Sequence, residues 1–191
     1  MIDEALARIS EIERRLGLPK QFYLKLEHED DWSFVIKLNA LFEAACTHLL
    51  TVRLQSPELE ESFAHLDFGN PKFGKVVLLR KLGCLSQPES KFLQLILELR
   101  NKLAHSISYV SFTFSEHLQA LDKNQSKSFA VAVRAEASET IYWNCRDEPR
   151  EKFILMHPKP SIWLTGADVL LSMHDSLMRL HEQRTEHGQD N

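Results

Sequence analysis

Two long stretches of this chain repeat apolar residues at steps of three and four, and this periodicity constrains the fold more than any other feature. They run from about residue 30 to 55 and from about 87 to 105. Such spacing places apolar side chains on one face of a helix. The chain of 191 residues holds only 6 glycines and 7 prolines, so few positions interrupt helices. We therefore expect an all-α protein. The predicted buried residues of the two helices are Phe34, Leu38, Leu41, Phe42, Ala45, Leu49, Val52, Phe92, Leu95, Ile96, Leu99 and Leu103.

Local signals predict where these two helices begin and end. Asp30 or Asp31 can cap the first, and Pro57 follows its end. Ser86 and Glu89 have the spacing of a capping box at the start of the second. Two long helices joined by shorter ones favour an antiparallel helical bundle.

Shorter periodic segments predict further helices at 1–16, 57–66, 73–82 and 165–184. Gly17 and Gly83 stand where the first and third of these would end. We divide the chain into a helical bundle at 1–124 and a C-terminal extension at 125–191, whose helix at 165–184 packs on the bundle.

Three segments have a weaker pattern. Residues 107–112 alternate like a strand and would also suit extended coil packed on the bundle, and 123–128 is a polar loop. Residues 129–136 suit either a helix or a strand. The range 140–164 contains three prolines together with Tyr142, Trp143 and Trp163. We interpret it as an irregular, partly β insert, and a two-stranded form would fit this pattern.

Composition limits the class of protein. The net charge of −4 argues against a protein that binds nucleic acid through a broadly basic surface, but it allows a local basic cleft. The cysteines Cys46, Cys84 and Cys145 are odd in number and form no C-x-x-C pair, which indicates reduced thiols. We see neither a basic-then-apolar leader nor an apolar run of about 18 residues. We therefore expect a cytoplasmic protein with no membrane segment.

The end of the second long helix carries the residues with the clearest chemical potential. Arg100, Asn101 and His105 form the pattern Arg-Asn-x-x-x-His. Asn101 and His105 are four residues apart and share a helix face. A histidine near a helix C-terminus has its protonated form favoured by the helix dipole, and a neighbouring guanidinium suits a phosphate. A structural interpretation is also open, in which Arg100 pairs with Glu43 or Glu98 and His105 merely ends the helix.

These groups match the needs of RNA cleavage without a metal. The reaction requires a base for the 2′-OH proton, an acid for the leaving 5′-oxygen, and positive charge beside the phosphorane. His105 would serve as acid or base, Arg100 would stabilise the phosphate charge, and Asn101 would orient either group. One imidazole does not readily fill both proton roles, so a twofold homodimer would supply the second.

The motif and its surroundings resemble the HEPN domain superfamily. Residues 34–45 resemble the first core helix of that family, in which an acidic residue, here Glu43, often faces the arginine. Residues 73–83 followed by 86–105 resemble the arrangement of the mannitol-operon-repressor-like and related groups. The resemblance covers about residues 30–122. It implies a dimer with the motif in a shared cleft.

The resemblance implies two functions. One is a metal-independent endoribonuclease, a toxin or defence effector of the toxin–antitoxin kind. The alternative is a non-catalytic transcriptional regulator that acts through a partner protein. Where some family toxins carry a modifiable tyrosine two residues after the histidine, this chain has Ile107.

Other patterns add an RNA-binding surface and no cofactor. The predicted RNA-binding cations are Lys72, Lys75, Arg80, Lys81 and Lys102. We find no metal-binding histidine motif and no glycine-rich phosphate loop, and so expect no metal and no cofactor. The partners expected are a second copy of the chain and either RNA or a partner protein, namely an antitoxin or a regulator.

Overall fold

Helix α3 (Asp31–Leu54) runs through the middle of the protein, in a computed structural model that describes residues 2–133 and 150–188. The Asp30 carboxylate accepts a hydrogen bond of 2.9 Å from the backbone N–H of Ser33 and so caps the helix. At the other end Gln55 adopts a left-handed conformation with φ of 54°, and Pro57 follows. The predicted start and end of this helix are confirmed.

Helix α6 (Gln87–Ala104) packs antiparallel on α3. The indole N–H of Trp32, near the start of α3, donates to the carbonyl of Leu103 at the end of α6 over 3.5 Å. Further along, the rings of Phe42 and Phe92 meet edge to face with centroids 5.8 Å apart. Ser86 and Glu89 form the predicted capping box, with both reciprocal hydrogen bonds present.

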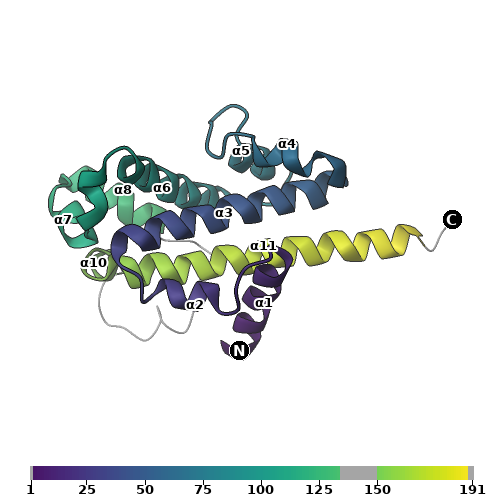
Figure 1. The fold of residues 1–191 in the computed structure, drawn as a ribbon, viewed down its shortest axis with the longest axis horizontal. Coiled ribbons are helices and arrows are strands. Elements are labelled where there is room, and N and C mark those ends of the chain that lie inside the picture. Colours follow the sequence, from purple (N-terminus) through teal and green to yellow (C-terminus); the bar gives the residue numbers. More distant parts are fainter. Residues whose placement is uncertain (1, 134–149, 189–191) are drawn as a thin grey trace.

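Helix α11 (Pro158–Gly188) packs against the opposite side of α3, and its C-terminal turns extend beyond the rest of the bundle (Figure 1). Helix α1 (Ile2–Arg15) packs on α11, where Arg8 and Asp175 form an ion pair. Helix α2 (Phe22–Leu26) lies beside them, and the Tyr23 ring stacks on Trp163 at 5.4 Å. The core therefore continues from the N-terminal helices through α3 into the C-terminal helix.

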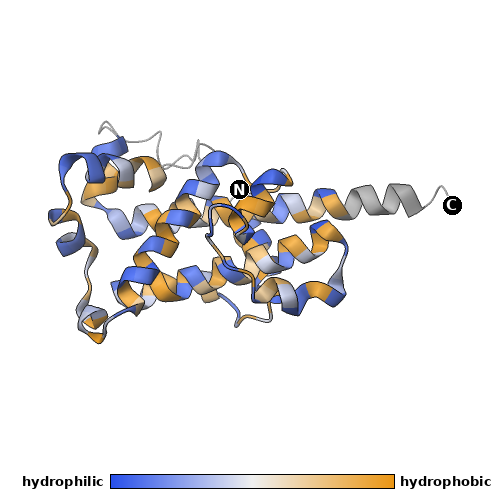
Figure 2. Ribbon diagram, turned by 90° about the horizontal axis from the view of Figure 1, so that it is seen from above, coloured by the Kyte–Doolittle hydropathy of each residue, from blue (hydrophilic) through white to orange (hydrophobic). Residues whose placement is uncertain are grey.

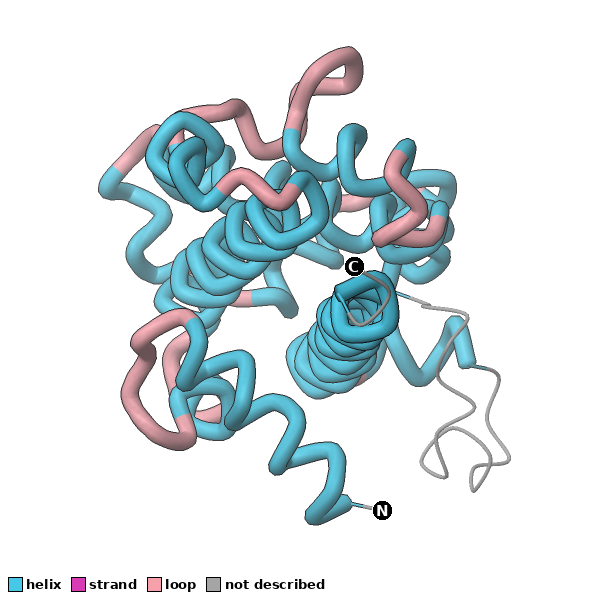
Figure 3. Tube along the Cα trace, turned by 90° about the vertical axis from the view of Figure 1, so that its right-hand side faces the viewer, coloured by secondary structure: helices cyan, strands magenta, loops and turns pink. Residues whose placement is uncertain are grey.

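Short helices complete the bundle, and within the described residues no strand occurs, so the predicted all-α class is confirmed (Figure 3). Between α3 and α6 they are η1 (Pro57–Leu59), α4 (Glu60–Ala64) and α5 (Lys75–Lys81). After α6 they are η2 (Ile107–Ser111), α7 (Phe114–Gln119), α8 (Lys123–Val133) and α10 (Arg150–Met156).

Several sequence predictions were wrong in these connecting regions. Residues 107–111 form a 3₁₀ helix, which begins where the Ser106 hydroxyl accepts from the backbone N–H of Ser108. The segment 123–128, predicted as a loop, forms the first turns of α8. The part of the expected partly β insert from 150 to 164 is helical, because Pro158 begins α11 and a proline is well tolerated in a first turn. The rest of that insert, 134–149, with Tyr142, Trp143 and Cys145, lies outside the described residues.

Apolar residues recur along the long helices (Figure 2), and the buried ones form one hydrophobic core cluster. Helix α3 is buried on more than one side because α4, α5, α6 and α11 all contact it. Its length and hydropathy would by themselves also suit a membrane crossing, a property that buried core helices of soluble proteins share. The sequence prediction that no apolar run approaches about 18 residues therefore underestimates the length of the apolar stretch in this helix.

Replacement of Gly166 by alanine is expected to destabilise the protein, although the same change in an open helix is usually stabilising. A Cβ at this position of α11 would lie 2.6 Å from the hydroxyl oxygen of Tyr23, whose ring is fully buried. Relieving that contact would also disturb the hydrogen bond from the Tyr23 hydroxyl to the carbonyl of Trp163. We expect a loss of about 1–3 kcal/mol in the free energy of unfolding, measured with urea. The partly buried Ser172 of the same helix is the control, since S172A should change it far less.

Candidate functional site

The predicted motif occupies the last turns of α6, and its members point in different directions. His105 is the C-terminal cap of the helix and is exposed, and the Arg100 side chain is 35% exposed. Five helical positions turn a side chain by about 140°, so Arg100 and His105 lie on different sides of α6. Asn101 is four positions from His105 and lies on nearly the same face. One copy of the chain therefore does not aim both charged groups at one point.

Arg100 belongs to a charged cluster that joins three helices. Its Nη2 lies 3.7 Å from Glu43 Oε2 on α3, and its Nη1 donates to Asn101 Oδ1 over 2.9 Å. The other oxygen of Glu43, Oε1, lies 3.5 Å from Lys75 Nζ on α5. The arginine–glutamate pairing is the one considered from the sequence. It fixes the guanidinium while leaving part of it open to solvent.

Apolar side chains project into solvent directly after His105. Ile107 is 84% exposed and Val110 is 55% exposed, both in η2. Large exposed apolar residues that gather beside polar groups are a feature of protein interfaces. The motif thus borders a surface that another molecule can cover.

The predicted RNA-binding cations do not form one surface. Lys75 must be removed from that set, because it is fully buried and its ammonium donates to the carbonyl of Ala64 over 2.9 Å. Arg80 bonds Gln87 at the start of α6, about 20 Å along the helix from Arg100. Lys81 follows Arg80 as the last residue of α5, and Lys72 is exposed in the loop before α5.

Lys102 points away from Arg100, toward a second group that the sequence did not single out. Its Nζ lies 3.4 Å from His117 Nδ1 on α7 and 5.9 Å from the centre of the Tyr109 ring. The His117 ring also contacts Phe112 and Phe129. Burial, and to a smaller extent the Lys102 charge, lower the pKa of His117. The sequence offered no signal for this pair, since its members are 15 residues apart and meet only through the turn after α6.

His117 is expected to make the protein less stable in mild acid. Because its pKa is lower in the folded than in the unfolded state, the unfolded chain binds more protons as pH falls through about 6.5. The free energy of unfolding should therefore fall as pH falls through that range and then level off below the folded-state pKa. H117Q should flatten this dependence in urea titrations at a series of pH values, and K102M should flatten it only in part, since burial is the larger cause. An unchanged slope in H117Q would contradict the assignment.

Other reactive groups do not gather at the motif. Within 3–133 and 150–180, the residues whose side chains the structure describes, no three His, Cys, Asp or Glu side chains lie close enough together to hold a metal ion. Cys46 and Cys84 are free thiols, and burial raises the pKa of both. These thiols have the character of core residues.

The candidate site therefore consists of an exposed imidazole, a partly exposed guanidinium held by Glu43, and a bordering apolar surface, all at one end of α6. These features come from the residues and contacts of this chain alone. Comparison of the chain with protein-family models, with curated proteins and with solved structures finds no match.

Proposed function

We propose that this protein is a metal-independent endoribonuclease of the HEPN type that acts as a homodimer. The observation that carries the proposal is the exposed imidazole of His105 at the end of α6, one helical turn from Asn101 and close in sequence to Arg100. An exposed histidine at a helix C-terminus is free to exchange protons with a substrate, and the guanidinium five residues earlier suits a phosphate.

The chemistry divides between these groups. One imidazole takes the proton from the 2′-hydroxyl of a ribose, and the freed oxygen attacks the adjacent phosphorus. A second imidazole, in its protonated form, gives its proton to the departing 5′-oxygen. The products are a 2′,3′-cyclic phosphate and a 5′-hydroxyl end. Arg100 stabilises the negative charge on the non-bridging oxygens, and Asn101 orients His105 or the phosphate.

A second copy of the chain provides what one copy lacks. Arg100 and His105 lie on different sides of α6, so His105 of one protomer and Arg100 of the other would meet across a twofold axis. The exposed Ile107 and Val110 border His105 and suit the apolar part of such an interface.

The direct test is incubation of the purified protein with single-stranded and structured RNA in excess EDTA. The expected result is cleavage that leaves 2′,3′-cyclic phosphate ends and that falls when the protein is diluted below the concentration at which the dimer forms. RNA that stays intact at all protein concentrations would contradict the proposal.

A second candidate function is that of a non-catalytic regulator that binds a partner protein. The observation that favours it is the engagement of Arg100, within one protomer, by both Glu43 and Asn101. A guanidinium held this way can serve the bundle alone. In that case the RNA assay fails while the protein still binds its partner.

A further inference from the structure

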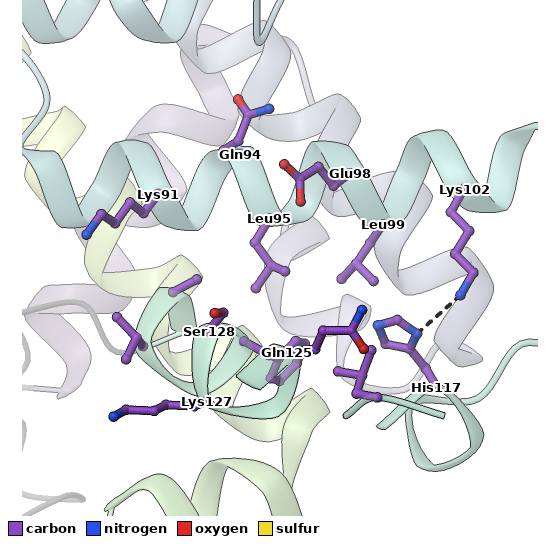
Figure 4. Close-up of a pocket in the computed structure, with 14 residues that line it drawn as sticks. Lys91, Gln94, Leu95, Glu98, Leu99, Lys102, His117, Gln125, Lys127 and Ser128 are labelled. Carbon is purple, nitrogen blue, oxygen red and sulfur yellow. Dashed lines mark hydrogen bonds between the residues drawn. The ribbon is translucent and has the colours of Figure 1, made fainter. Parts of the chain in front are cut away.

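A groove of about 670 Å³ lies between α6 on one side and α7 and α8 on the other, away from the Arg100 cluster. Figure 4 shows Leu95 and Leu99 pointing from α6 into this groove, with Lys91 at one end and Lys102 at the other. On α6 these lysines are eleven positions apart, or about 16 Å along the axis. The groove is therefore long enough for roughly three turns of a helix.

The floor of the groove is apolar and its rim is cationic. Apolar side chains make up the floor, and Val131 of α8 is 50% exposed. Lys91, Lys102 and Lys127 stand around the rim against one carboxylate, that of Glu98. This local excess of positive charge occurs in a chain whose net charge is −4. The floor residues are Leu95, Leu99, Leu121, Phe129, Val131 and Ala132.

We propose that this groove binds an amphipathic helix of a partner protein that carries acidic residues beside its apolar stripe. Leu95 of α6 is partly exposed and Val131 of α8 is 50% exposed, whereas Leu99 is buried at 4% exposed, so an apolar stripe of a partner helix would rest on Leu95 and Val131. The lysines at both ends and on the α8 side would pair with carboxylates flanking that stripe. The proposal does not depend on whether the protein cleaves RNA.

The lining favours a protein helix over a nucleic acid. Single-stranded RNA binds to exposed aromatic rings along a basic track. Of the two described rings that line the groove, Phe129 is only 3% exposed, and His117 is partly buried against Phe112 and Phe129. The rest of the floor is aliphatic.

Fluorescence anisotropy with a labelled synthetic helix tests this proposal. The probe is a peptide of about twelve residues with leucines at i, i+3, i+4 and i+7 and glutamates on the flanks. The comparison peptide keeps the leucines and carries lysines in place of the glutamates. We expect saturable binding of the acidic peptide, and affinity for the basic one at least about tenfold lower.

Variants of the groove make the test specific. V131E should weaken binding of the acidic peptide by about tenfold or more, and K127E by about 3- to 10-fold. K123E is the matched control, since Lys123 is exposed on the same helix but does not line the groove, and its affinity should stay within about twofold. Circular dichroism checks the fold of each variant, and V131S replaces V131E if that variant unfolds.

Three results would overturn the proposal. One is the absence of saturable binding of the acidic peptide up to about 1 mM. Another is equal binding of the acidic and basic peptides, and the third is binding that V131E or V131S leaves unchanged. A different outcome would assign the groove to nucleic acid instead. In that outcome single-stranded RNA binds the wild-type protein, V131E abolishes this binding, and the acidic peptide does not bind.

Discussion

Replacement of His105 by alanine is expected to lower metal-independent RNA cleavage by at least about 10²–10⁴-fold, the usual contribution of one general acid or base. The imidazole is exposed and caps the end of α6, so its removal should leave the fold intact. In the proposed homodimer every active site contains both imidazoles, and H105A removes the base and the acid together. The measurement is the rate of cleavage of a labelled RNA in EDTA, with the same protein concentration for each variant.

Two matched variants sharpen this experiment. H65A changes another exposed histidine, at the end of α4, and should cleave at the wild-type rate. R100K keeps the positive charge but loses the planar fork of donors, so its rate of RNA cleavage should lie between that of the wild-type protein and that of R100Q. If H105A cleaves RNA as fast as the wild-type protein, the activity does not belong to this site.

Replacement of Glu43 by alanine is expected to cost about 2–3 kcal/mol in the free energy of unfolding. The change would leave the ammonium of Lys75, which is fully buried, with the carbonyl of Ala64 as its remaining partner. Loss of one member of a fully buried ion pair costs about 3–5 kcal/mol. We expect less here because the Glu43 side chain is 32% exposed, so water can partly replace it. Urea denaturation of the variant and of the wild-type protein measures the difference.

The double variant separates the buried charge from other causes. K75M replaces the ammonium by an apolar group of similar length, and such replacements of buried ion pairs are often neutral. We therefore expect E43A to cost much less when K75M is already present. Equal costs of E43A in the two backgrounds would show that Lys75 does not depend on Glu43. R100Q in the same assay should cost less than E43A, because the guanidinium is partly exposed.

Local chemistry explains which elements were predictable. Asp30 caps α3, and Ser86 with Glu89 caps α6, because each cap needs only a side-chain oxygen within three residues of a free N–H. The buried stripes of both helices follow from a spacing visible in the sequence. Local signals gave a wrong prediction after residue 157. The prolines there indicated an irregular segment, because prolines usually interrupt helices, but Pro158 begins a helix.

The candidate site was predictable only in part. Arg100, Asn101 and His105 are close in sequence, and the pairing of Arg100 with Glu43 was among the sequence-based alternatives. Whether a lysine is a surface cation was not predictable, since Lys75 turns into the core at the start of α5 whereas Lys72, three residues earlier, is exposed.

The all-α class, the two long helices and the position of the Arg-Asn-x-x-x-His motif follow from the amino-acid sequence, because periodicity and capping act over a few residues. Three features emerge from the packing of the helices: Lys75 is buried against Glu43, Lys102 turns toward His117, and α6, α7 and α8 line an apolar groove. These features depend on which helix faces lie against one another. That packing depends on the fit of many side chains from distant parts of the chain, so it cannot be predicted from any short stretch of sequence.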